Sequence, residues 1–531
     1  LPMMIALVSG LNMKKLLKDN ILIRKIDGAE TAGSLNILFS DKTGTITKGA
    51  LQVVDFISPE GKDYQSFASI PDPLREMLLI NIWGNTNAIA LVNNGTLQVT
   101  GGNATERALH EFVGVDGTLT YETYKMECED TLMFNSANKY SASVMKGRLN
   151  RAIIKGAPEK LLAYCTAYYG EDLQVHPLTD EVRAVLEKRM AALSEKAMRV
   201  LAFATSDNRI GEHLLQDMTF VGMVGIRDEL RPEAVQAIQT AKRAGIQVVM
   251  VTGDKKETAA AIARDAKLIE STDDLALTSE DLASMSDEEL KKVLPRLRVV
   301  ARALPTDKSR LVRVSQELNL VVGMTGDGVN DAPALKKADV GFAMGSGTEV
   351  SKEAAAITIL DDNFNSVVKT VLYGRTIYNN IRKFIVFQLT INISAVLIAL
   401  IGPFIGMGTP LSVTQMLWVN IVMDTLAALA LGGEPALDRY MDEKPKRRDE
   451  SIISKNMWSS LLVMGIYLTT ASLVFLQHPF FQSLFRLDGE MVYEGHDIYF
   501  MTGFFCFYVL SAMLNGFNAR TEKLNIFDNI M

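Results

Sequence analysis

The sequence predicts an α/β protein with a doubly wound parallel sheet, a second domain inserted into that sheet, and a bundle of membrane α-helices. Short apolar runs alternate with helical stretches through residues 221–370, as in a parallel sheet. A further apolar run, 35–39, lies far upstream of these, so the residues between them form an insertion. Four long apolar segments follow residue 370. With 531 residues, the chain is too long for one hydrophobic core.

Charge and cysteine content exclude two classes of function. The formal net charge is −7, so the chain lacks the basic footprint of a nucleic-acid-binding protein. Three cysteines occur, at Cys128, Cys165 and Cys506. Their wide spacing and odd number fit a reducing compartment and exclude a disulfide framework or a cysteine metal site.

The domain organisation follows from these shifts in composition. The chain is apolar from its first residue and has no basic flank, so residues 1–15 are interpreted as the C-terminal half of a transmembrane helix left at a cut end. Residues 16–50 and 221–370 form the two parts of the sheet domain, and 51–220 form the inserted domain. Residues 371–531 form the membrane domain.

Four segments are predicted to cross the membrane, at about 384–405, 411–432, 457–476 and 499–517. Each has close to the ~20 residues needed to span a bilayer. The link 438–455 is basic, with Arg439, Lys444, Lys446, Arg447, Arg448 and Lys455, whereas the link after Gln477 is mainly acidic. The positive-inside rule therefore places the first link and the sheet domain in the cytoplasm.

Asp41 is the candidate nucleophile. The apolar run 35–39 delivers it into the loop Ser40-Asp41-Lys42-Thr43-Gly44-Thr45, where small and hydroxyl-bearing residues surround one carboxylate. In such a setting a carboxylate can attack a phosphoryl group. The alternative is that Ser40 and Asp41 cap a turn.

The ends of further strands carry matching chemistry. One run ends in Thr252-Gly253-Asp254, another in Thr325-Gly326-Asp327-Gly328-Val329-Asn330-Asp331, and Lys308 follows Arg302 in a loop after a third. In doubly wound sheets, ligands bind at the carboxyl ends of strands. These ends supply hydroxyl donors, a cation and a carboxylate cluster suited to Mg²⁺, which is what phosphoryl transfer requires.

These motifs resemble those of the P-type ATPases, cation pumps that form an aspartyl phosphate on a haloacid dehalogenase-like phosphorylation domain. The resemblance covers essentially the whole chain. Residues 41–47 resemble the phosphorylation sequence, with Ile46 where Leu is commoner, and residues 325–335 resemble the hinge motif. The resemblance implies Mg²⁺ on Asp327, with help from Asp41 and the Thr43 carbonyl. The catalytic residues that it implies are Asp41, Lys308, Thr252, Asp254, Thr325, Asn330 and Asp331.

Two motifs depart from the family pattern. Lys255 replaces the frequent Asn after Thr252-Gly253-Asp254. The run Asp228-Glu229-Leu230-Arg231 stands where Asp-Pro-Pro-Arg is usual, which concerns a hinge rather than the chemistry.

The insertion 51–220 resembles the family's nucleotide-binding domain, an α+β domain that binds ATP. Lys155 and Gly156 belong to its lysine motif, Glu106 to the segment facing adenine, and Phe134 stands where a ring stacks on the base. The stretch 134–139 lacks the Arg residues common there. The nucleotide-binding residues implied are Glu106, Phe134, Lys139, Lys155, Gly156, Arg199, Thr43, Gly253 and Arg302.

Polar residues inside the membrane segments predict an ion site. Asn420 and Asp424 lie four residues apart and so on one helical face, and Gln388 and Asn392 repeat this spacing on the preceding segment. Such oxygen ligands suit a hard cation such as Ca²⁺. The predicted ligands are Asn420, Asp424 and Asn392, and interhelical hydrogen bonding is the alternative for Gln388.

The membrane segments are most similar to those of type II calcium pumps of the plasma-membrane branch. Ala395 and Ala512 stand where two-site reticulum pumps carry Glu, and Met423 stands where they carry Thr. The resemblance implies an ATP-driven pump that exports one Ca²⁺ per cycle across the plasma membrane. It also implies a truncated chain without an actuator domain, which alone should not complete a transport cycle.

Two other functions remain open at this point. The same class of pump could carry Na⁺, Mn²⁺ or H⁺, which also bind Asn and Asp oxygens. The chain could instead be a membrane-tethered phosphohydrolase, but such enzymes carry an acid/base Asp two residues after the nucleophile, where this chain has Thr43.

Overall fold

A computed structural model describes residues 2–520 except 136–137, 197, 212, 407–408, 447, 449, 485–491 and 494–495. The chain divides into two compact units, each described here by itself. Unit 1 comprises Leu1–Phe39, Thr240–Gln247 and Ser309–Met531, and unit 2 comprises Ser40–Gln239 and Val248–Lys308. Arg447 and most of the acidic link after Gln477, on which the predicted orientation partly depends, lie outside the described residues.

Unit 1 contains the strand order β1 (Ile21–Ile23), β19 (Ile357–Ile359), β18 (Val340–Met344), β17 (Val322–Gly326) and β2 (Ile37–Asp41). β1 is antiparallel to β19, and the remaining neighbours are parallel. Phe39 of β2 is in register with Met324 of β17. The apolar runs therefore form buried parallel strands, as the sequence predicts.

The sheet helices of unit 1 are short and come directly after strands. They are α2 (Ile26–Ala32), α12 (Ala332–Lys337) and α13 (Glu349–Ala354). The backbone N–H of Gln247, the first residue of β14, donates to the carbonyl of Asn36 over 2.9 Å. Gln247 and Asn36 both belong to unit 1, so this bond lies within that unit.

Unit 2 contains three parallel strands in the order β14 (Gln247–Val251), β16 (Leu297–Ala301) and β15 (Leu275–Thr278). Helix α8 (Lys256–Asp265) follows β14, and α11 (Pro305–Glu317) follows β16. α9 (Ser279–Ser284) and α10 (Asp287–Val293) begin at side-chain caps, Thr278 and Ser286. Strand and helix thus alternate here as the sequence predicts.

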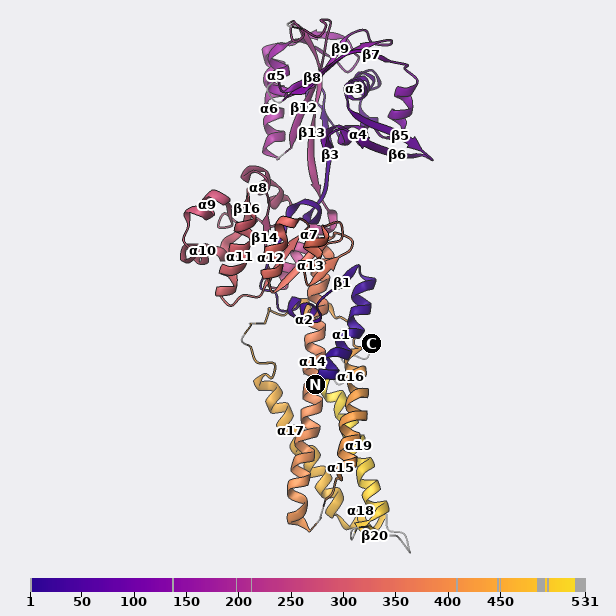
Figure 1. Ribbon diagram of the computed structural model, residues 1–531, viewed down its shortest axis with the longest axis vertical. Helices are drawn as coiled ribbons and strands as arrows, with labels where there is room; N and C mark the ends of the chain where they lie inside the picture. Colours follow the sequence, from indigo (N-terminus) through magenta and orange to yellow (C-terminus); the bar gives the residue numbers. More distant parts are fainter. Residues whose placement is uncertain are drawn as a thin grey trace. The chain divides into compact units, whose positions relative to one another are not determined.

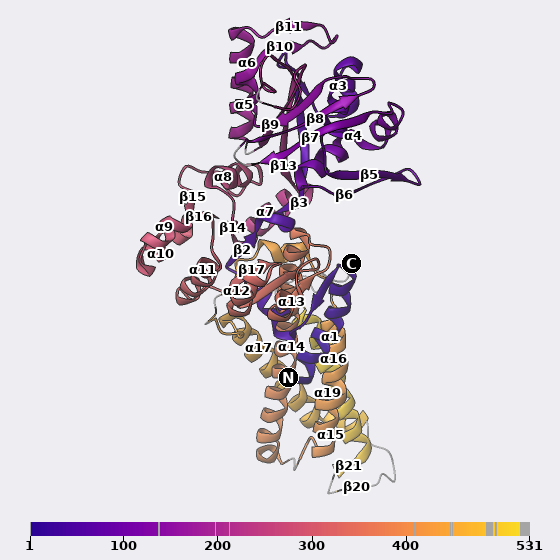
Figure 2. The same cartoon turned by 45° about the horizontal axis from the view of Figure 1, so that its top comes forward.

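The inserted domain of unit 2 is framed by two long antiparallel strands, β3 (Thr47–Ile57) and β13 (Met218–Leu230), which run side by side in Figure 2. Thr47 pairs with Leu230, and Ile57 pairs with Met223. Gly222, with φ +147°, sits where a Cβ would lie 2.5 Å from the Phe56 ring, so only glycine lets β13 approach β3 there. The predicted boundaries, 51 and 220, fall within these strands.

A nine-stranded sheet forms the core of the inserted domain. Its order is β11-β10-β13-β12-β9-β8-β7, with β3 and β4 (Asp63–Tyr64) joined through β13. The other strands are β7 (Glu127–Asn135), β8 (Tyr140–Lys146), β9 (Ala152–Gly156), β10 (Cys165–Tyr169), β11 (Val175–Pro177) and β12 (Arg199–Ser206). The helices are α3 (Asp72–Gly84), α4 (Ala104–Glu122), α5 (Pro158–Tyr164) and α6 (Asp180–Glu195), and β5 (Ala88–Asn93) pairs with β6 (Thr96–Gly101).

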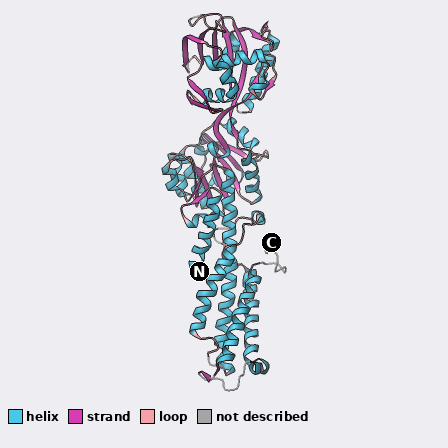
Figure 3. Ribbon diagram, turned by 90° about the vertical axis from the view of Figure 1, so that its right-hand side faces the viewer, coloured by secondary structure: helices cyan, strands magenta, loops and turns pink. Residues whose placement is uncertain are grey.

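Four helical segments of unit 1 are long and apolar enough to cross a membrane: Phe364–Ile405, Val413–Gly432, Lys455–Gln477 and Ile498–Ala519. They match the four predicted segments, except that the first helix, α14 (Phe364–Ile401), begins twenty residues before the predicted start at 384. The added turns include charged residues such as Lys369 and Arg375, but they contact α2 and are capped by Asn363, so the helix continues beyond the span. α17 (Lys455–Gln477) packs along α14 (Figure 1), and Figure 3 shows the long helices of this region in cyan.

The second membrane span is interrupted by a π-helical turn, and other helices pack on it and on α14. The second span is α15 (Val413–Trp418), a π-helical turn Val419–Met423, and α16 (Asp424–Gly432). The first helix of the chain, α1 (Pro2–Lys18), packs on α14 and α16, and α19 (Ile498–Ala519) packs on α14 and α17.

Candidate functional site

Asp41 and Lys308 form the centre of the candidate phosphorylation site. Lys308 Nζ lies 3.0 Å from Asp41 Oδ2, and the backbone N–H of Lys42 donates to Asp41 Oδ1 over 2.7 Å. Lys308 is buried in the first turn of α11, which Asp307 caps by accepting the Leu304 N–H over 2.9 Å. The structure thus brings together the predicted nucleophile and the predicted cation.

Lys42 is a buried cation that the sequence analysis did not single out. Its Nζ lies 2.8 Å from Asp254 and 3.6 Å from Asp228. This links the loop after Asp41 to the predicted Thr252-Gly253-Asp254 motif. Its position next to Asp41 in the sequence could have pointed to this role, but a lysine at that position is equally consistent with a solvated surface charge.

Residues 228–231 depart from the family pattern in their two middle residues. The two end residues, Asp228 and Arg231, hydrogen-bond the loop after Asp41. Asp228 accepts the Thr47 hydroxyl over 2.6 Å and the Gly49 N–H over 2.9 Å. Arg231 donates to the carbonyls of Gly44 over 3.1 Å and Thr47 over 3.3 Å. Gly44 has φ +76°, which lets the loop turn back toward β3. The departure therefore leaves the contacting residues in place.

The loops after β14 and β16 are joined by backbone hydrogen bonds. Thr252 is buried, and its hydroxyl accepts the Asp254 N–H over 3.2 Å. The N–H of Arg302 donates to the Asp254 carbonyl, and that of Ala303 donates to the Thr252 carbonyl, both over 2.9 Å. These hydrogen bonds therefore join the predicted residues Thr252, Asp254 and Arg302 at one edge of the sheet, with Gly253 between the first two.

In unit 1, the predicted residues after β17 form a tight turn. Buried Asp331 accepts the N–H groups of Asp327 over 3.3 Å and Gly328 over 3.2 Å. The Asp327 carbonyl accepts the Thr348 N–H over 2.8 Å and the Ser351 hydroxyl over 3.0 Å. Thr325 is buried within β17, whereas Asn330 is exposed on the turn. Asp331 thus shapes the loop that carries Asp327.

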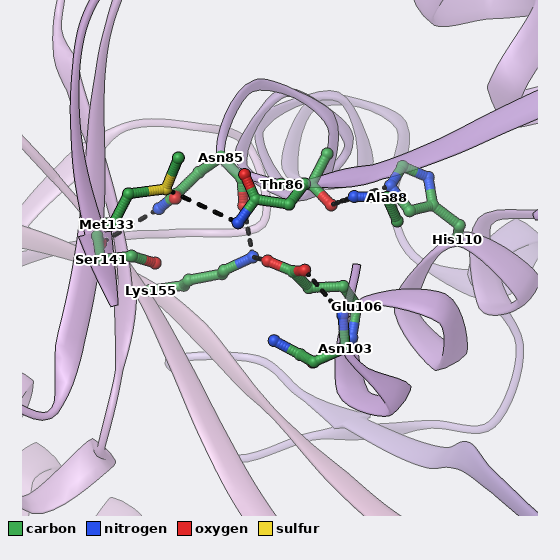
Figure 4. Close-up of polar contacts among 10 residues, drawn as sticks. Asn85, Thr86, Ala88, Asn103, Glu106, His110, Met133, Ser141 and Lys155 are labelled. Carbon is green, nitrogen blue, oxygen red and sulfur yellow. Dashed lines mark hydrogen bonds and ion pairs between the residues drawn. The ribbon is translucent and has the colours of Figure 1, made fainter. Parts of the chain in front are cut away.

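The candidate nucleotide site centres on a buried ion pair, shown in Figure 4. Lys155 Nζ lies 2.9 Å from Glu106 Oε1 and also donates to the Asn85 carbonyl. Glu106 is fixed at the start of α4 by a capping box, because its other oxygen accepts the Asn103 N–H over 3.1 Å. Burial lowers the pKa of Lys155. Burial by itself would raise the pKa of Glu106, but the charge of Lys155 outweighs this effect, so the pKa of Glu106 is lowered. The predicted pair Glu106 and Lys155 is therefore in direct contact.

The other predicted nucleotide residues of the inserted domain differ in exposure and contacts, and one of them, Gly156, directly follows Lys155 in β9. Phe134 on β7 is 61% exposed, and the Lys139 side chain is exposed, with its Nζ 3.8 Å from Glu159. Arg199 donates to the Thr105 hydroxyl over 3.1 Å. A Cβ on Gly156 would lie 2.6 Å from the Tyr140 Cβ, so glycine is needed where β9 meets β8. Residues 136–137 of the predicted stretch lie outside the described residues.

His110 lies behind the ion pair and was missed by the sequence analysis. It is fully buried, with its Nε2 3.3 Å from the Thr86 hydroxyl and its ring edge-on to Trp83 at 4.6 Å. Burial, together with Lys155, lowers the pKa of His110 to about 4. A neutral ring therefore supports α4 at neutral pH. A lone His in a helical sequence carries no signal for this role.

In the membrane domain, Asp424 is buried and accepts a hydrogen bond from Gln388 Nε2 over 2.9 Å. Asn420 is exposed, although the four-residue spacing predicts that it shares a face with Asp424. Asn420 lies within the π-helical turn Val419–Met423, which ends directly before Asp424 and changes the rotation per residue, and this explains the difference. Asn392 is half-buried, one turn beyond Gln388. The structure thus pairs Asp424 with Gln388 rather than with Asn420.

A second buried carboxylate, Glu434, lies just beyond the second span. It is 2.7 Å from Arg520 and pairs with Lys383 as well. With Arg520 it forms the charged end of an otherwise apolar cavity of about 510 Å³ between α14, α16 and α19. The sequence analysis ended the span at 432 and so did not consider it.

Three family profiles match the chain. "P-type ATPase, cytoplasmic domain N" matches residues 73–233, "haloacid dehalogenase-like hydrolase" matches 318–371, and "Cation transporting ATPase, C-terminus" matches 408–531. The cytoplasmic domain N profile covers most of the inserted domain, and the hydrolase profile covers β17, β18 and β19. The profiles thus support the predicted haloacid dehalogenase-like and membrane architecture.

Many curated proteins are similar over the whole chain. Calcium-transporting ATPase 3, plasma membrane-type, of Oryza sativa subsp. japonica is 36% identical over 547 residues, which cover 99% of this chain and 52% of that protein. Calcium-transporting ATPase 12, plasma membrane-type, of Arabidopsis thaliana is 34% identical, covering 100% and 52%. Plasma membrane calcium-transporting ATPase 4 of Bos taurus is 36% identical, covering 100% and 47%.

The chain therefore spans about half the length of the curated relatives that it matches. The matched profiles, the four apolar helices and the carboxylate-lysine pair at a strand end agree with one another. The chain is that of a multi-pass integral membrane protein, and it belongs to the P-type ATPase family, among the relatives of plasma-membrane-type calcium pumps.

Proposed function

We propose that the full-length protein is an ATP-driven calcium pump that forms an aspartyl phosphate on Asp41. The contact between Asp41 and Lys308, at 3.0 Å, carries this proposal. A carboxylate that attacks a triphosphate is repelled by it, and a fixed cation at that carboxylate offsets the repulsion. Residues 16–50 with 221–370 are the proposed phosphorylation domain, and 51–220 the proposed nucleotide-binding domain.

The proposed chemical step uses the chain's own groups. An Asp41 carboxylate oxygen attacks the γ-phosphorus of ATP, the bond from that phosphorus to the bridging oxygen breaks, and ADP leaves with the electron pair. Lys308 holds the attacking group and offsets negative charge. Thr252, Thr325 and the loop N–H groups are the proposed donors to phosphoryl oxygens, while the contact with Asp254 holds Lys42.

The residues present fit a Mg²⁺ ion. Inside unit 1, Phe39 is in parallel register with Met324, so the residues that follow each strand emerge at the same edge. Asp41 is the last residue of β2 and Asp327 follows β17, and carboxylate oxygens are the ligands that Mg²⁺ prefers. Asp41, the Thr43 carbonyl and Asp327 would hold the ion, with Asn330 and Asp331 supporting the turn. When bound, Mg²⁺ neutralises charge on the phosphates.

The inserted domain is the proposed ATP site. Glu106 and Lys155 form its buried polar floor, and exposed Phe134 is available to stack on a base. Lys139, Gly156 and Arg199 complete the proposed binding surface, and Thr43, Gly253 and Arg302 the proposed phosphate side.

Asp424 is the proposed ligand of one transported Ca²⁺, with Asn392 on the neighbouring helix and Asn420 as a further ligand once the π turn rearranges. A buried intramembrane carboxylate points to an ion pathway. The proposed location is the plasma membrane, with the catalytic domains in the cytoplasm and the lipid bilayer around the four spans. The basic link that contains Lys444 and Lys446 supports this orientation.

Phosphorylation of the full-length protein from radiolabelled ATP tests this function. Ca²⁺ with Mg²⁺ should give an acid-stable, hydroxylamine-labile phosphoenzyme, and Asp41→Asn should abolish it. Asp207→Asn, at an exposed surface carboxylate, is the matched control and should leave it intact. If incorporation of the label required Na⁺ or Mn²⁺ instead of Ca²⁺, that ion would be the transported cation. Rapid turnover without any cation dependence would favour a phosphohydrolase.

A further inference from the structure

Gln388 and Asp424 meet inside the membrane domain through one defined hydrogen bond. Gln388 lies on α14 and Asp424 begins α16, and the Gln388 Nε2 donates to Asp424 Oδ2 over 2.9 Å. In the described part of the chain, Gln388 is the one side chain that hydrogen-bonds this carboxylate. A buried carboxylate in a membrane span needs such a partner, because no water replaces it.

The chemistry of the partner matters for a cation site. A lysine or arginine in this place would neutralise Asp424 and repel a cation. An amide is neutral, so it orients the carboxylate and leaves its negative charge available. Its bond to Oδ2 also distinguishes the two carboxylate oxygens, since Oδ1 is then the oxygen free to turn toward a cation.

The backbone around Asp424 makes this restraint more important. The π-helical turn Val419–Met423 ends directly before Asp424, so the chain on its N-terminal side is not a regular α-helix. Asn420, on that turn, is exposed and gives Asp424 no support. Gln388 reaches across from the continuous helix α14, on which Asn392 lies one turn further on the same face.

We propose that Gln388 is a positioning residue for the transported cation. Its amide holds Oδ2 of Asp424, so that the carboxylate presents Oδ1 as a single-oxygen ligand toward the side where Asn392 lies. Ligating carboxylates are commonly held by such a hydrogen bond, and its loss typically costs 10–100-fold in metal affinity. The inference rests on the proposed calcium pump and assigns to Gln388 an orienting role rather than that of a ligand.

Equilibrium binding of ⁴⁵Ca²⁺ to the purified full-length protein, with competition by Sr²⁺, tests this role. Gln388→Met keeps the shape of the side chain and removes the amide. The half-saturating Ca²⁺ concentration should rise by about tenfold, while the number of sites and ATP binding stay unchanged. Preference for Ca²⁺ over Sr²⁺ should also fall, because a freed carboxylate can bind through both oxygens and so accepts a larger ion.

Two further variants keep the test sharp. Gln388→Asn retains the amide one methylene short of Asp424 and should show the same loss, which covers a failure of the Met variant to fold. Gln477→Met is the matched control, because Gln477 donates to the backbone carbonyl of Ile405 and not to a carboxylate. Unchanged Ca²⁺ affinity and selectivity in both Gln388 variants would overturn the positioning role alone. Absence of Ca²⁺ binding to the unmodified protein would overturn both the role and the proposed cargo.

Discussion

The Nη2 of Arg375 donates to the backbone carbonyl of Ala244 over 2.7 Å. Arg375 lies in α14 and is buried, and Ala244 follows α7 (Pro232–Arg243). The same guanidinium donates to the carbonyls of Gly33 over 3.2 Å, Tyr440 over 2.8 Å and Glu443 over 2.7 Å. One side chain thus ties together the end of α2, the chain before β14 and the link after the second span.

Arg375→Lys is expected to destabilise the protein even though it keeps the charge. Lysine is a point donor and cannot reach four carbonyls in a planar fork, so buried acceptors lose their partners, at about 1–3 kcal/mol each. The measurement is thermal unfolding of the detergent-solubilised protein. Arg313→Lys, in an exposed i,i+4 pair with Glu317, is the control and should change stability by less than about 1 kcal/mol. Equal melting temperatures of the two variants would show that the four hydrogen bonds of Arg375 do not stabilise the fold.

Lys308→Met is expected to slow formation of the phosphoenzyme by roughly 10²-fold or more, since it removes the cation 3.0 Å from the proposed nucleophile. Nucleotide binding should be retained. Rapid-quench phosphorylation at saturating ATP measures the rate. Lys48→Met removes a half-exposed lysine paired with Glu229 and should leave the rate near that of the unmodified protein. A Lys308 variant that phosphorylates at the normal rate would show that its charge is not used.

His110 predicts how stability changes with pH. Its pKa is lowered to about 4 by burial in the folded state, against about 6.5 when unfolded, so the unfolded chain binds the proton more tightly. The contribution of His110 to stability is present above pH 6.5 and declines as the pH falls toward 4, by at most about 3 kcal/mol. His110→Gln should flatten this part of a melting-temperature profile, whereas His213→Gln, at an exposed site, should not. An unchanged slope in the His110 variant would place the titration elsewhere.

The sequence predicted the strands and membrane spans because their signals are local. The run 35–39 is apolar except for Asn36, and it leads into a buried strand. All four predicted spans end within three residues of the observed segments, and three of them also begin within three residues. The extension of α14 to Phe364 was not predictable from hydropathy, because residues such as Arg375 are buried by contacts with distant segments. The same limit explains the missed roles of Lys42 and Glu434.

Spacing alone was a weaker guide in the ion site. Asn420 and Asp424 would share a face in a regular α-helix, but the π turn that contains Asn420 breaks that periodicity. In the candidate nucleotide site, Glu106 and Lys155 come from two separate elements, and they were predicted only through the resemblance to a family. Neither residue has a periodic signal that points to the other.

The final prediction concerns the Glu106 and Lys155 pair, which is buried and 2.9 Å apart. Glu106→Gln leaves a buried ammonium without its counter-charge, and Lys155→Met leaves a buried carboxylate, so each single change should cost about 3–5 kcal/mol. Glu106→Gln/Lys155→Met leaves neither charge, and its cost should be well below the sum of the two single costs. Denaturant unfolding of the three variants gives the coupling free energy directly. Glu129→Gln/Lys146→Met, at an exposed pair 2.9 Å apart, is the control cycle and should show a coupling below about 1 kcal/mol. If the two cycles gave equal coupling, the buried pair would contribute no more to the domain than a surface contact.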